Sequence, residues 1–203
     1  MKHKLKNLTQ QTNNKFLNIF LAEYEVDDGV KHYQICSRKP RDKLQVYFPD
    51  TVNSDGVRIL PYFYENGKIK VCFIKEFRYA INNYLYGLPA GLIDKDEDPM
   101  VSAKRELHEE IGATPIKIIM TDKAAYCSAG MSDESIICFE ALVELDGTQN
   151  LDFSEDISLE IVDFDDLLTF IDSHIMGVQS SLQVRAFYYK TLYEQLKNKQ
   201  WLG

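Results

Sequence analysis

The stretch GLIDKDEDPMVSAKRELHEEIGA, residues 91–113, decides the fold, because it encodes a helix with a clear beginning and a clear end. Asp98 suits the N-cap, and Pro99 suits the first helical position, where its missing N–H costs nothing. Gly112 suits a left-handed residue just past the helix. We therefore predict a helix that begins at Pro99 and ends before Gly112. Its apolar residues recur at spacings of three and four and share one face, and they are Met100, Ala103, Leu107 and Ile111.

The same predicted helix is strongly acidic, because it carries Glu106, Glu109 and Glu110 near its C-terminal end. Glu106 and Glu110 lie about one turn apart on one side, where like charges destabilise a helix by about 0.2–0.5 kcal/mol per pair. The helix dipole also disfavours negative charge at this end. A bound divalent cation would remove the penalty, and hard carboxylate oxygens suit Mg²⁺ shared with substrate phosphates. The alternative is an acidic face in contact with solvent.

Strand patterns lie on both sides of this helix. Upstream, two apolar runs at 57–64 and 69–77 flank Asn66-Gly67, a pair that favours a tight hairpin. Downstream, strands are expected at 116–120, 135–145 and 157–162, followed by helices near 164–173 and 180–199. Mixed strands with two or three helices indicate an α+β fold. Packing inside the fold is expected for a stripe on the last helix, formed by Leu182, Phe187, Tyr188, Leu192 and Leu196.

The N-terminal part has a different pattern. Residues 16–38 alternate as an antiparallel hairpin around a break at 27–29, and LQVYF at 44–48 is expected to be another strand. The turn-rich stretch at 49–56 is the best candidate boundary. We therefore divide the chain into residues 1–50, an N-terminal β extension, and residues 51–203, the domain that carries the predicted helix.

Composition narrows the function classes. The chain has 203 residues with 31 acidic and 23 basic side chains, and its formal net charge of −8 argues against a nucleic-acid polymer as the partner. No apolar run approaches the roughly 18 residues that a membrane helix needs. The polar start and the four cysteines without C-x-x-C spacing predict reduced thiols and a cytoplasmic protein. The four histidines show no metal-ligand spacing.

Residues 91–113 resemble the Nudix hydrolase box: Gly, five residues, Glu, seven residues, then Arg-Glu-apolar-any-Glu-Glu-any-Gly-apolar. Every fixed position matches. The resemblance implies a Nudix fold, in which a mixed β-sheet is sandwiched between helices, here with the antiparallel extension in front of it. It also implies an enzyme that uses divalent ions to add water to a nucleoside diphosphate linked to another group. The physical need is clear, since an anionic diphosphate repels a hydroxide nucleophile.

The resemblance also assigns roles within the box. Glu106 and Glu110 are the implied principal metal ligands, with Glu109 also available. Arg105 is expected to orient the glutamates by ion pairing, and Glu97 to brace it in a similar way. The implied ion is Mg²⁺, with Mn²⁺ as the alternative.

Four further segments resemble the ADP-ribose pyrophosphatase and nucleotide-sugar hydrolase subfamily: residues 75–79, 88–94, 126–134 and 154–157. By this resemblance, the carbonyl of Ala90 is a metal ligand, and Arg78 contacts the substrate phosphates. Glu155 is the first choice as a ligand for the outer metal, with Asp156 behind it, and the general base remains unassigned. The substrate-binding set implied by the resemblance is Arg78, Phe16, Arg38 and Glu134.

The N-terminal extension is expected to mediate a homodimer. In the resembled enzymes this hairpin provides an aromatic partner for adenine across a dimer interface. That nominates Phe16 for stacking and Arg38 for a polar contact. A two-stranded hairpin is also marginal by itself and should pair with another sheet or subunit.

Two departures keep the substrate open. Ala129 stands where the subfamily often has a proline that marks ADP-sugar specificity, and Gly87 stands where a glutamate is common. The first prediction is cleavage of ADP-ribose to AMP and ribose 5-phosphate. The second is the same reaction on another nucleotide sugar, such as GDP-mannose. The third, from another class, is a Nudix module that senses a nucleotide without turnover.

Overall fold

The computed structural model describes residues 3–153 and 155–200, with side chains described as far as Asn198. The chain forms two compact units. The N-terminal unit combines the chain up to Asp55 with Lys123–Ile136, and the second unit, which carries the box at residues 91–113 and is called the box unit, combines Gly56–Asp122 with the chain from Ile137 on. The insertion of Lys123–Ile136 into the N-terminal unit was not part of the sequence-based division. No helix within the described ranges is both long and apolar enough to cross a bilayer.

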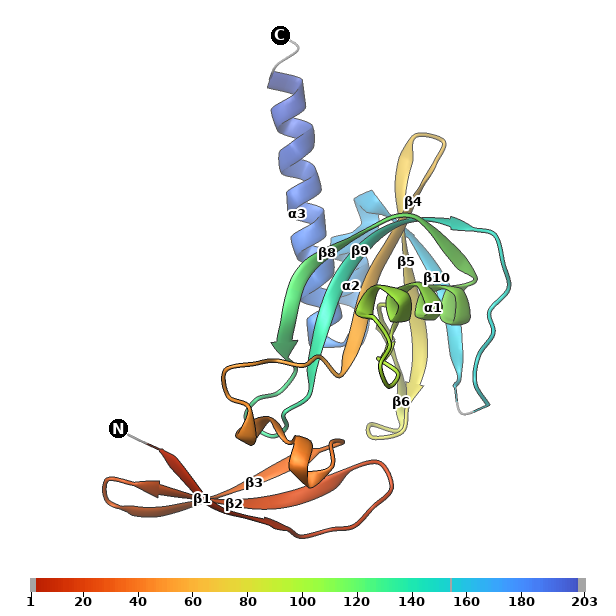
Figure 1. Ribbon diagram of the computed structural model, residues 1–203. Coiled ribbons are helices and arrows are strands. Elements are labelled where there is room, and N and C mark those ends of the chain that lie inside the picture. Colours follow the sequence, from red (N-terminus) through yellow and green to blue (C-terminus); the bar gives the residue numbers. More distant parts are fainter. Residues whose placement is uncertain (1–2, 154, 201–203) are drawn as a thin grey trace. The chain divides into compact units, whose positions relative to one another are not determined.

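The N-terminal unit is built on a three-stranded antiparallel sheet of order β1-β2-β3 (Figure 1). Its elements are β1 (Lys4–Gln10), β2 (Asn18–Val26), β3 (Gly29–Ser37) and the two 3₁₀ turns Arg41–Lys43 and Gln45–Tyr47. The β2–β3 hairpin confirms the prediction for 16–38. The core of this unit is small and consists of Leu8, Phe20, Ala22, Ile35 and Leu44.

The predicted strand at 44–48 is wrong, because this segment forms 3₁₀ turns. Leu44 is fully buried, and the backbone N–H of Gln45 donates to Asp133 Oδ2 at 3.1 Å instead of joining a ladder. Strand β1 was not predicted, since it lies at the edge of the sheet and Leu8 is its one fully buried residue among those described. An edge strand with so little burial has no strong alternation to detect.

The box unit contains a seven-stranded sheet with the path β10-β5-β4-β9-β8, in which β6 pairs with β5 and β7 pairs with β4. Asn66 and Gly67 both have positive φ, 51° and 77°, and they form the predicted tight turn between β4 and β5. The strands are β4 (Gly56–Glu65), β5 (Lys68–Arg78), β6 (Asn83–Gly87), β7 (Ala90–Leu92), β8 (Ala113–Tyr126), β9 (Ser135–Leu145) and β10 (Ile157–Asp163). The helices are α1 (Pro99–Ile111), α2 (Leu167–Ser173), which follows the 3₁₀ turn Phe164–Asp166, and α3 (Val178–Gln200).

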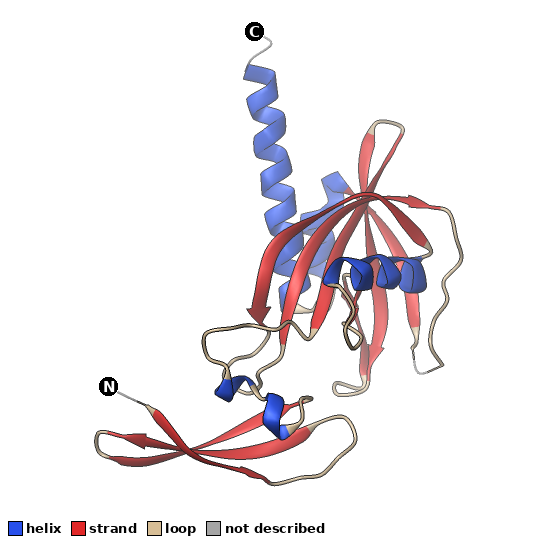
Figure 2. Ribbon diagram, in the orientation of Figure 1, coloured by secondary structure: helices blue, strands red, loops and turns tan. Residues whose placement is uncertain are grey.

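Helices cover both faces of this sheet, with α1 on one face and α2 and α3 on the other (Figures 1 and 2). Side chains alternate along β5, since Cys72 and Ile74 belong to the core under α1. Val71 and Phe73 belong to the core under α2 and α3. The α+β prediction, a sheet between helices with an antiparallel N-terminal extension, is confirmed.

Helix α1 begins and ends where the sequence predicted. Asp98 Oδ1 accepts the backbone N–H of Met100 at 2.8 Å, and Gly112 is left-handed with φ 60° and ψ 40°. A Cβ at position 112 would lie 2.6 Å from the carbonyl oxygen of Gly147, so the position has no room for a side chain. These caps fix the axial position of the glutamates on α1.

The predicted packing stripe on α3 is correct only in part. Phe187 is buried in the core, but Leu182 and Leu196 are each 62% exposed. Phe187 lies five positions from Leu182, about 140° round a helix with 3.6 residues per turn, so the two cannot share a face. The inward face instead carries Val184 and Phe187.

Candidate active site

The two glutamates one turn apart on α1 are buried. Glu106 is 6% exposed and Glu110 is 3% exposed. Glu110 Oε2 accepts the backbone N–H of Ala90 from β7 at 3.0 Å. Glu106 lies against Gly91, where an added Cβ would be 1.9 Å from Glu106 Oε1. Glycine at position 91 therefore lets the helix carboxylate approach the strand backbone.

Arg105 pairs with several acidic side chains around this helix, on the side that we call the outer side. Its guanidinium donates to Glu97 Oε2 at 3.2 Å, to Glu106 Oε1 at 2.7 Å and to Glu109 Oε2 at 3.0 Å. A fourth hydrogen bond reaches the carbonyl of Leu92 at 3.0 Å. The hydrogen bond from Arg105, together with one from the Ser102 hydroxyl, lowers the pKa of Glu97 to about 2. The ion pairs expected of Arg105 and Glu97 are thus present in the structure.

On the inner side, Glu110 accepts the Ala90 N–H and has no ion pair among the described residues, whereas Glu106 also pairs with Arg105. Burial raises the pKa of Glu110 well above its ordinary value, the charge of Glu106 adds to this, and the Ala90 N–H opposes it. The charges of Glu76 and Glu155 raise the pKa of Glu110 further. Burial likewise raises the pKa of Glu106, although Arg105 opposes the shift. We call the four residues Glu76, Glu106, Glu110 and Glu155 the acidic cluster.

Glu155 reaches the acidic cluster through the β5–β10 pairing. Ile157 is the register partner of Glu76, and the N–H of Phe77 donates to the carbonyl of Asp156 at 3.1 Å. Asp156 itself accepts a hydrogen bond from the hydroxyl of Tyr84. The structure therefore places the predicted Glu155 within electrostatic range of the box glutamates, while its carboxylate accepts the N–H of Asp152 at 2.8 Å, and it engages Asp156 elsewhere.

Sequence reasoning missed Glu76, although a signal for it was present. Side chains alternate across a strand, so the face that carries Cys72 and Ile74 also carries Glu76 and Arg78. Glu76 Oε2 forms an ion pair with Arg78 Nη2 at 2.7 Å. Burial raises the pKa of Glu76, Arg78 opposes this, and the charge of Glu155 adds to it. The predicted phosphate-binding arginine is therefore paired with an acid that the sequence analysis did not select.

A divalent cation fits the chemistry of this cluster. Buried carboxylates that repel one another, with Arg105 shared among three of its neighbours, are oxygen donors suited to Mg²⁺ or Mn²⁺. Within the described residues, no three Asp, Glu, His or Cys side chains stand in a ready coordination geometry. Arg105 holds Glu106, and the Ala90 N–H holds Glu110, so both carboxylates would have to turn toward an ion.

The remaining predicted residues belong to the N-terminal unit. Arg38 Nε donates to Glu134 Oε1 at 3.2 Å, so these two predicted substrate contacts form an ion pair with each other. Phe16 is 67% exposed, and the ammonium of Lys15 lies 4.7 Å from its ring centroid. All three residues belong to the same unit, in which the Arg38–Glu134 pair joins the end of β3 to the 123–136 segment.

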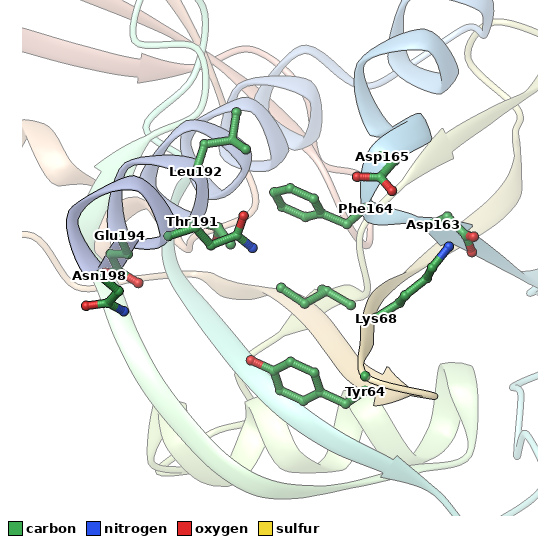
Figure 3. A pocket seen from close by; sticks show the side chains of 12 residues that line it. Tyr64, Lys68, Asp163, Phe164, Asp165, Thr191, Leu192, Glu194 and Asn198 are labelled. Carbon is green, nitrogen blue, oxygen red and sulfur yellow. The ribbon is translucent and has the colours of Figure 1, made fainter. Parts of the chain in front are cut away.

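A separate pocket of about 400 Å³ lies on the α3 side of the sheet (Figure 3). Its walls come from the β4–β5 turn, the start of the 3₁₀ turn at Phe164 and the outer part of α3, with Tyr64, Lys68 and Leu192 among them. None of its lining residues belongs to the acidic cluster. This pocket is therefore separate from the candidate site that the carboxylates form.

Comparison with known proteins agrees with this geometry. Residues 53–178, more than half of the chain, match the model of the NUDIX domain. The chain belongs to the Nudix family. A solved structure described as an ADP compounds hydrolase shares the fold of this Nudix chain, with a TM-score of 0.72 and 16% identity over 95% of this chain and 96% of the other.

Two curated Nudix relatives are similar in sequence. A Caenorhabditis elegans protein named "Putative nudix hydrolase 2" is 31% identical over 143 residues, which cover 66% of this chain and 64% of that protein. The ADP-ribose pyrophosphatase of Bacillus subtilis is 34% identical over 106 residues, which cover 51% of this chain and 57% of that enzyme. The matched region thus spans less than two thirds of either relative.

Proposed function

We propose that this Nudix chain is a divalent-metal-dependent hydrolase that cleaves the diphosphate of a nucleoside diphosphate sugar, with ADP-ribose giving AMP and ribose 5-phosphate as the first candidate. The observation that carries the proposal is the acidic cluster, in which the buried Glu106 and Glu110 lie within electrostatic range of Glu76 and Glu155. The described ion pairs join Glu106 to Arg105 and Glu76 to Arg78 but give no cation to Glu110 or Glu155. A structural role alone would not favour burying like charges together, because desolvation and repulsion both cost free energy.

We assign the metal to Glu106 and Glu110 as principal ligands, with Glu109, Glu155 and the carbonyl of Ala90 as the others. When bound, Mg²⁺ or Mn²⁺ neutralises the diphosphate and acidifies a water molecule. Arg105 and Glu97 hold the outer side of α1 through their ion pair and so fix the helix that carries the ligands. Arg78 is half-exposed at the end of β5, where its guanidinium can donate to two phosphate oxygens.

The choice of ADP-ribose rests on the sequence segments around the box and on the similarity to the Bacillus subtilis ADP-ribose pyrophosphatase. Another nucleotide sugar, such as GDP-mannose, is the alternative because Ala129 replaces the proline expected there. Ala129 lines a pocket of about 330 Å³ within the N-terminal unit, together with Tyr24, Tyr33 and Tyr126. Three tyrosines provide stacking surfaces that do not discriminate strongly between bases.

A substrate panel tests the reaction. Purified protein is incubated with ADP-ribose, GDP-mannose, other nucleotide sugars and nucleoside triphosphates, each with Mg²⁺, Mn²⁺ or EDTA, and the phosphate-containing products are identified. We expect metal-dependent conversion of ADP-ribose to AMP and ribose 5-phosphate well above the other compounds. A preference for GDP-mannose supports the alternative substrate. Binding of a nucleotide without turnover under any metal condition would instead support the sensor.

We also propose a homodimer formed through the N-terminal unit, in a cytoplasmic protein. None of the four cysteines, all within the described chain, forms a disulfide, which supports a reducing compartment. Phe16, Leu17, Val30 and Tyr33 are exposed apolar or aromatic residues around the β2–β3 hairpin, and such residues favour burial by a partner.

Light scattering at micromolar concentration tests the dimer, and activity measured over serial dilution tests whether the second subunit contributes to the site. We expect a mass of twice 23.5 kDa and a specific activity that falls on dilution below the dissociation constant. A monomer with dilution-independent activity would exclude this assembly.

A further inference from the structure

Glu76 and Arg78 form a pair that differs from the other ion pairs of the site. The two residues lie on the same face of β5, two positions apart, and Arg78 Nη2 lies 2.7 Å from Glu76 Oε2 in an ion pair. The Glu76 side chain is only 16% exposed, whereas the Arg78 side chain is 52% exposed. The acid therefore lies beneath the guanidinium, and the guanidinium faces outward.

The surroundings of Glu76 explain why its carboxylate needs a cationic partner. The carboxyl is partly desolvated and lies within electrostatic range of Glu155 and Glu110, both of which disfavour another negative charge. Arg78 is the cation that opposes this repulsion. A half-buried carboxylate among other carboxylates lowers the stability of the folded protein unless a cation pairs with it or it has a functional role.

The pair leaves Arg78 able to bind a second anion. A guanidinium has five N–H donors in a planar fork, and the ion pair with Glu76 is made by Nη2. The remaining donors are available to phosphate oxygens. Arginine loses rotamer entropy when it is fixed, so a side chain already held by a neighbour binds its ligand at a smaller cost in free energy.

We propose that Glu76 is a positioning residue, whose carboxylate holds the Arg78 guanidinium beside the box glutamates so that its free donors meet the diphosphate of the substrate. This inference rests on the proposed function, because it concerns how the same site takes up its diphosphate. Glu76 acts through Arg78 and not on the reacting atoms. Its effect should therefore be on substrate binding and should vanish once Arg78 is removed.

A double-mutant cycle tests this coupling. The variants are Glu76→Ala, Arg78→Ala and the double variant, with Glu76→Gln as the conservative change. Glu160→Ala is the matched control, since it removes an exposed carboxylate from the neighbouring strand β10. For each protein, kcat and KM are measured with ADP-ribose and Mg²⁺, and the Kd of the non-hydrolysable α,β-methylene analogue of ADP-ribose is measured by calorimetry.

We expect Glu76→Ala to raise KM and Kd about tenfold while kcat stays within about threefold, the signature of a lost binding interaction. Arg78→Ala should raise KM and Kd at least as much, and the double variant should match Arg78→Ala within about threefold, because coupled residues are not additive. Glu76→Gln keeps an acceptor oxygen for Arg78 and should lie between Glu76→Ala and the wild type. If Glu76→Ala fails to fold, Glu76→Gln replaces it in the double-mutant cycle.

Three results would overturn the inference: an unchanged KM for both Glu76 variants, effects of Glu76→Ala and Arg78→Ala that multiply in the double variant, or a loss of kcat without a change in KM. Each of these assumes a wild-type protein that hydrolyses the substrate. Failure of the proposed function is distinguished from them, because the wild type would then neither turn over ADP-ribose nor bind its analogue.

Discussion

Glu97 and Glu110 belong to the same sequence motif, but the protein surrounds their carboxylates in opposite ways. Glu97 receives hydrogen bonds from Arg105, from the Ser102 hydroxyl and from the N–H of Asp94, which lower its pKa to about 2. Glu110 is almost fully buried, and burial together with the charge of Glu106 raises its pKa well above its ordinary value. One acid has its charge balanced within the chain and the other does not.

This difference separates the supporting half of the box from the half that can react. On the outer side of α1, the ion pairs to Arg105 balance the acidic charges without a bound cation. A substitution there should therefore alter the geometry of the helix and the stability of the protein. The acidic cluster carries more negative than positive charge. A divalent cation that neutralises the excess would therefore bind there favourably. The comparison therefore predicts opposite consequences for neutralising acids on the two sides.

The largest effect is expected from Glu110→Gln. At saturating Mg²⁺, kcat should fall by at least about a hundredfold, because loss of a charged ligand removes several kcal/mol of transition-state stabilisation. Glu109→Gln is the matched change, since Glu109 lies next in sequence, is more exposed and is already held by Arg105. Its kcat should fall by less than about tenfold.

The stability of the same two variants without metal sharpens the contrast. In EDTA, Glu110→Gln should have a thermal midpoint equal to or above that of the wild type, because it relieves the repulsion within the acidic cluster. Glu109→Gln loses an ion pair with Arg105 and should not gain stability. A Glu110→Gln variant that keeps more than about a tenth of the wild-type rate, under roughly 1.4 kcal/mol, would disprove its assignment as a principal ligand, a role that the proposal does not give to Glu109.

The sequence alone predicted the features that depend on the backbone preferences of neighbouring residues. Asp98, Pro99 and Gly112 specify the two ends of α1, and Asn66-Gly67 specifies the β4–β5 turn, since each depends on its own backbone preferences. The spacing of Glu106 and Glu110 then follows from the helix. These are the parts of the site that a motif can encode.

Other features depend on contacts between distant segments. LQVYF has the composition of a strand, but Leu44 is buried in the N-terminal core and Gln45 donates to Asp133, so the segment turns instead. Glu76 joins the acidic cluster only because β5 pairs with β10 and brings Glu155 beside it. Alternation from Ile74 predicts the face on which Glu76 lies, but not which acids it meets there.

The smallest expected effect is on the pH dependence of stability at Glu97. The folded-state pKa of Glu97 is about 2, below its ordinary value of 4.5. A carboxyl with a lowered pKa stabilises the folded protein above its unfolded pKa, and this contribution is lost as the pH falls through the folded value. The stability that Glu97 provides should therefore be complete at neutral pH and should decrease between about pH 4.5 and pH 2.

Glu97→Gln removes this titration while keeping a side chain of similar shape, so wild type and variant should differ most at neutral pH and converge as the solution is acidified. Thermal unfolding in EDTA at pH 7, 5, 4 and 3, at constant ionic strength, measures the difference. Glu144→Gln, an exposed change on β9, controls for the loss of one charge elsewhere on the sheet. A gap between wild type and Glu97→Gln that stays constant down to pH 3 would show that the Arg105 pairing contributes packing and not charge, and the contrast between the two halves of the box would then rest on Glu110 alone.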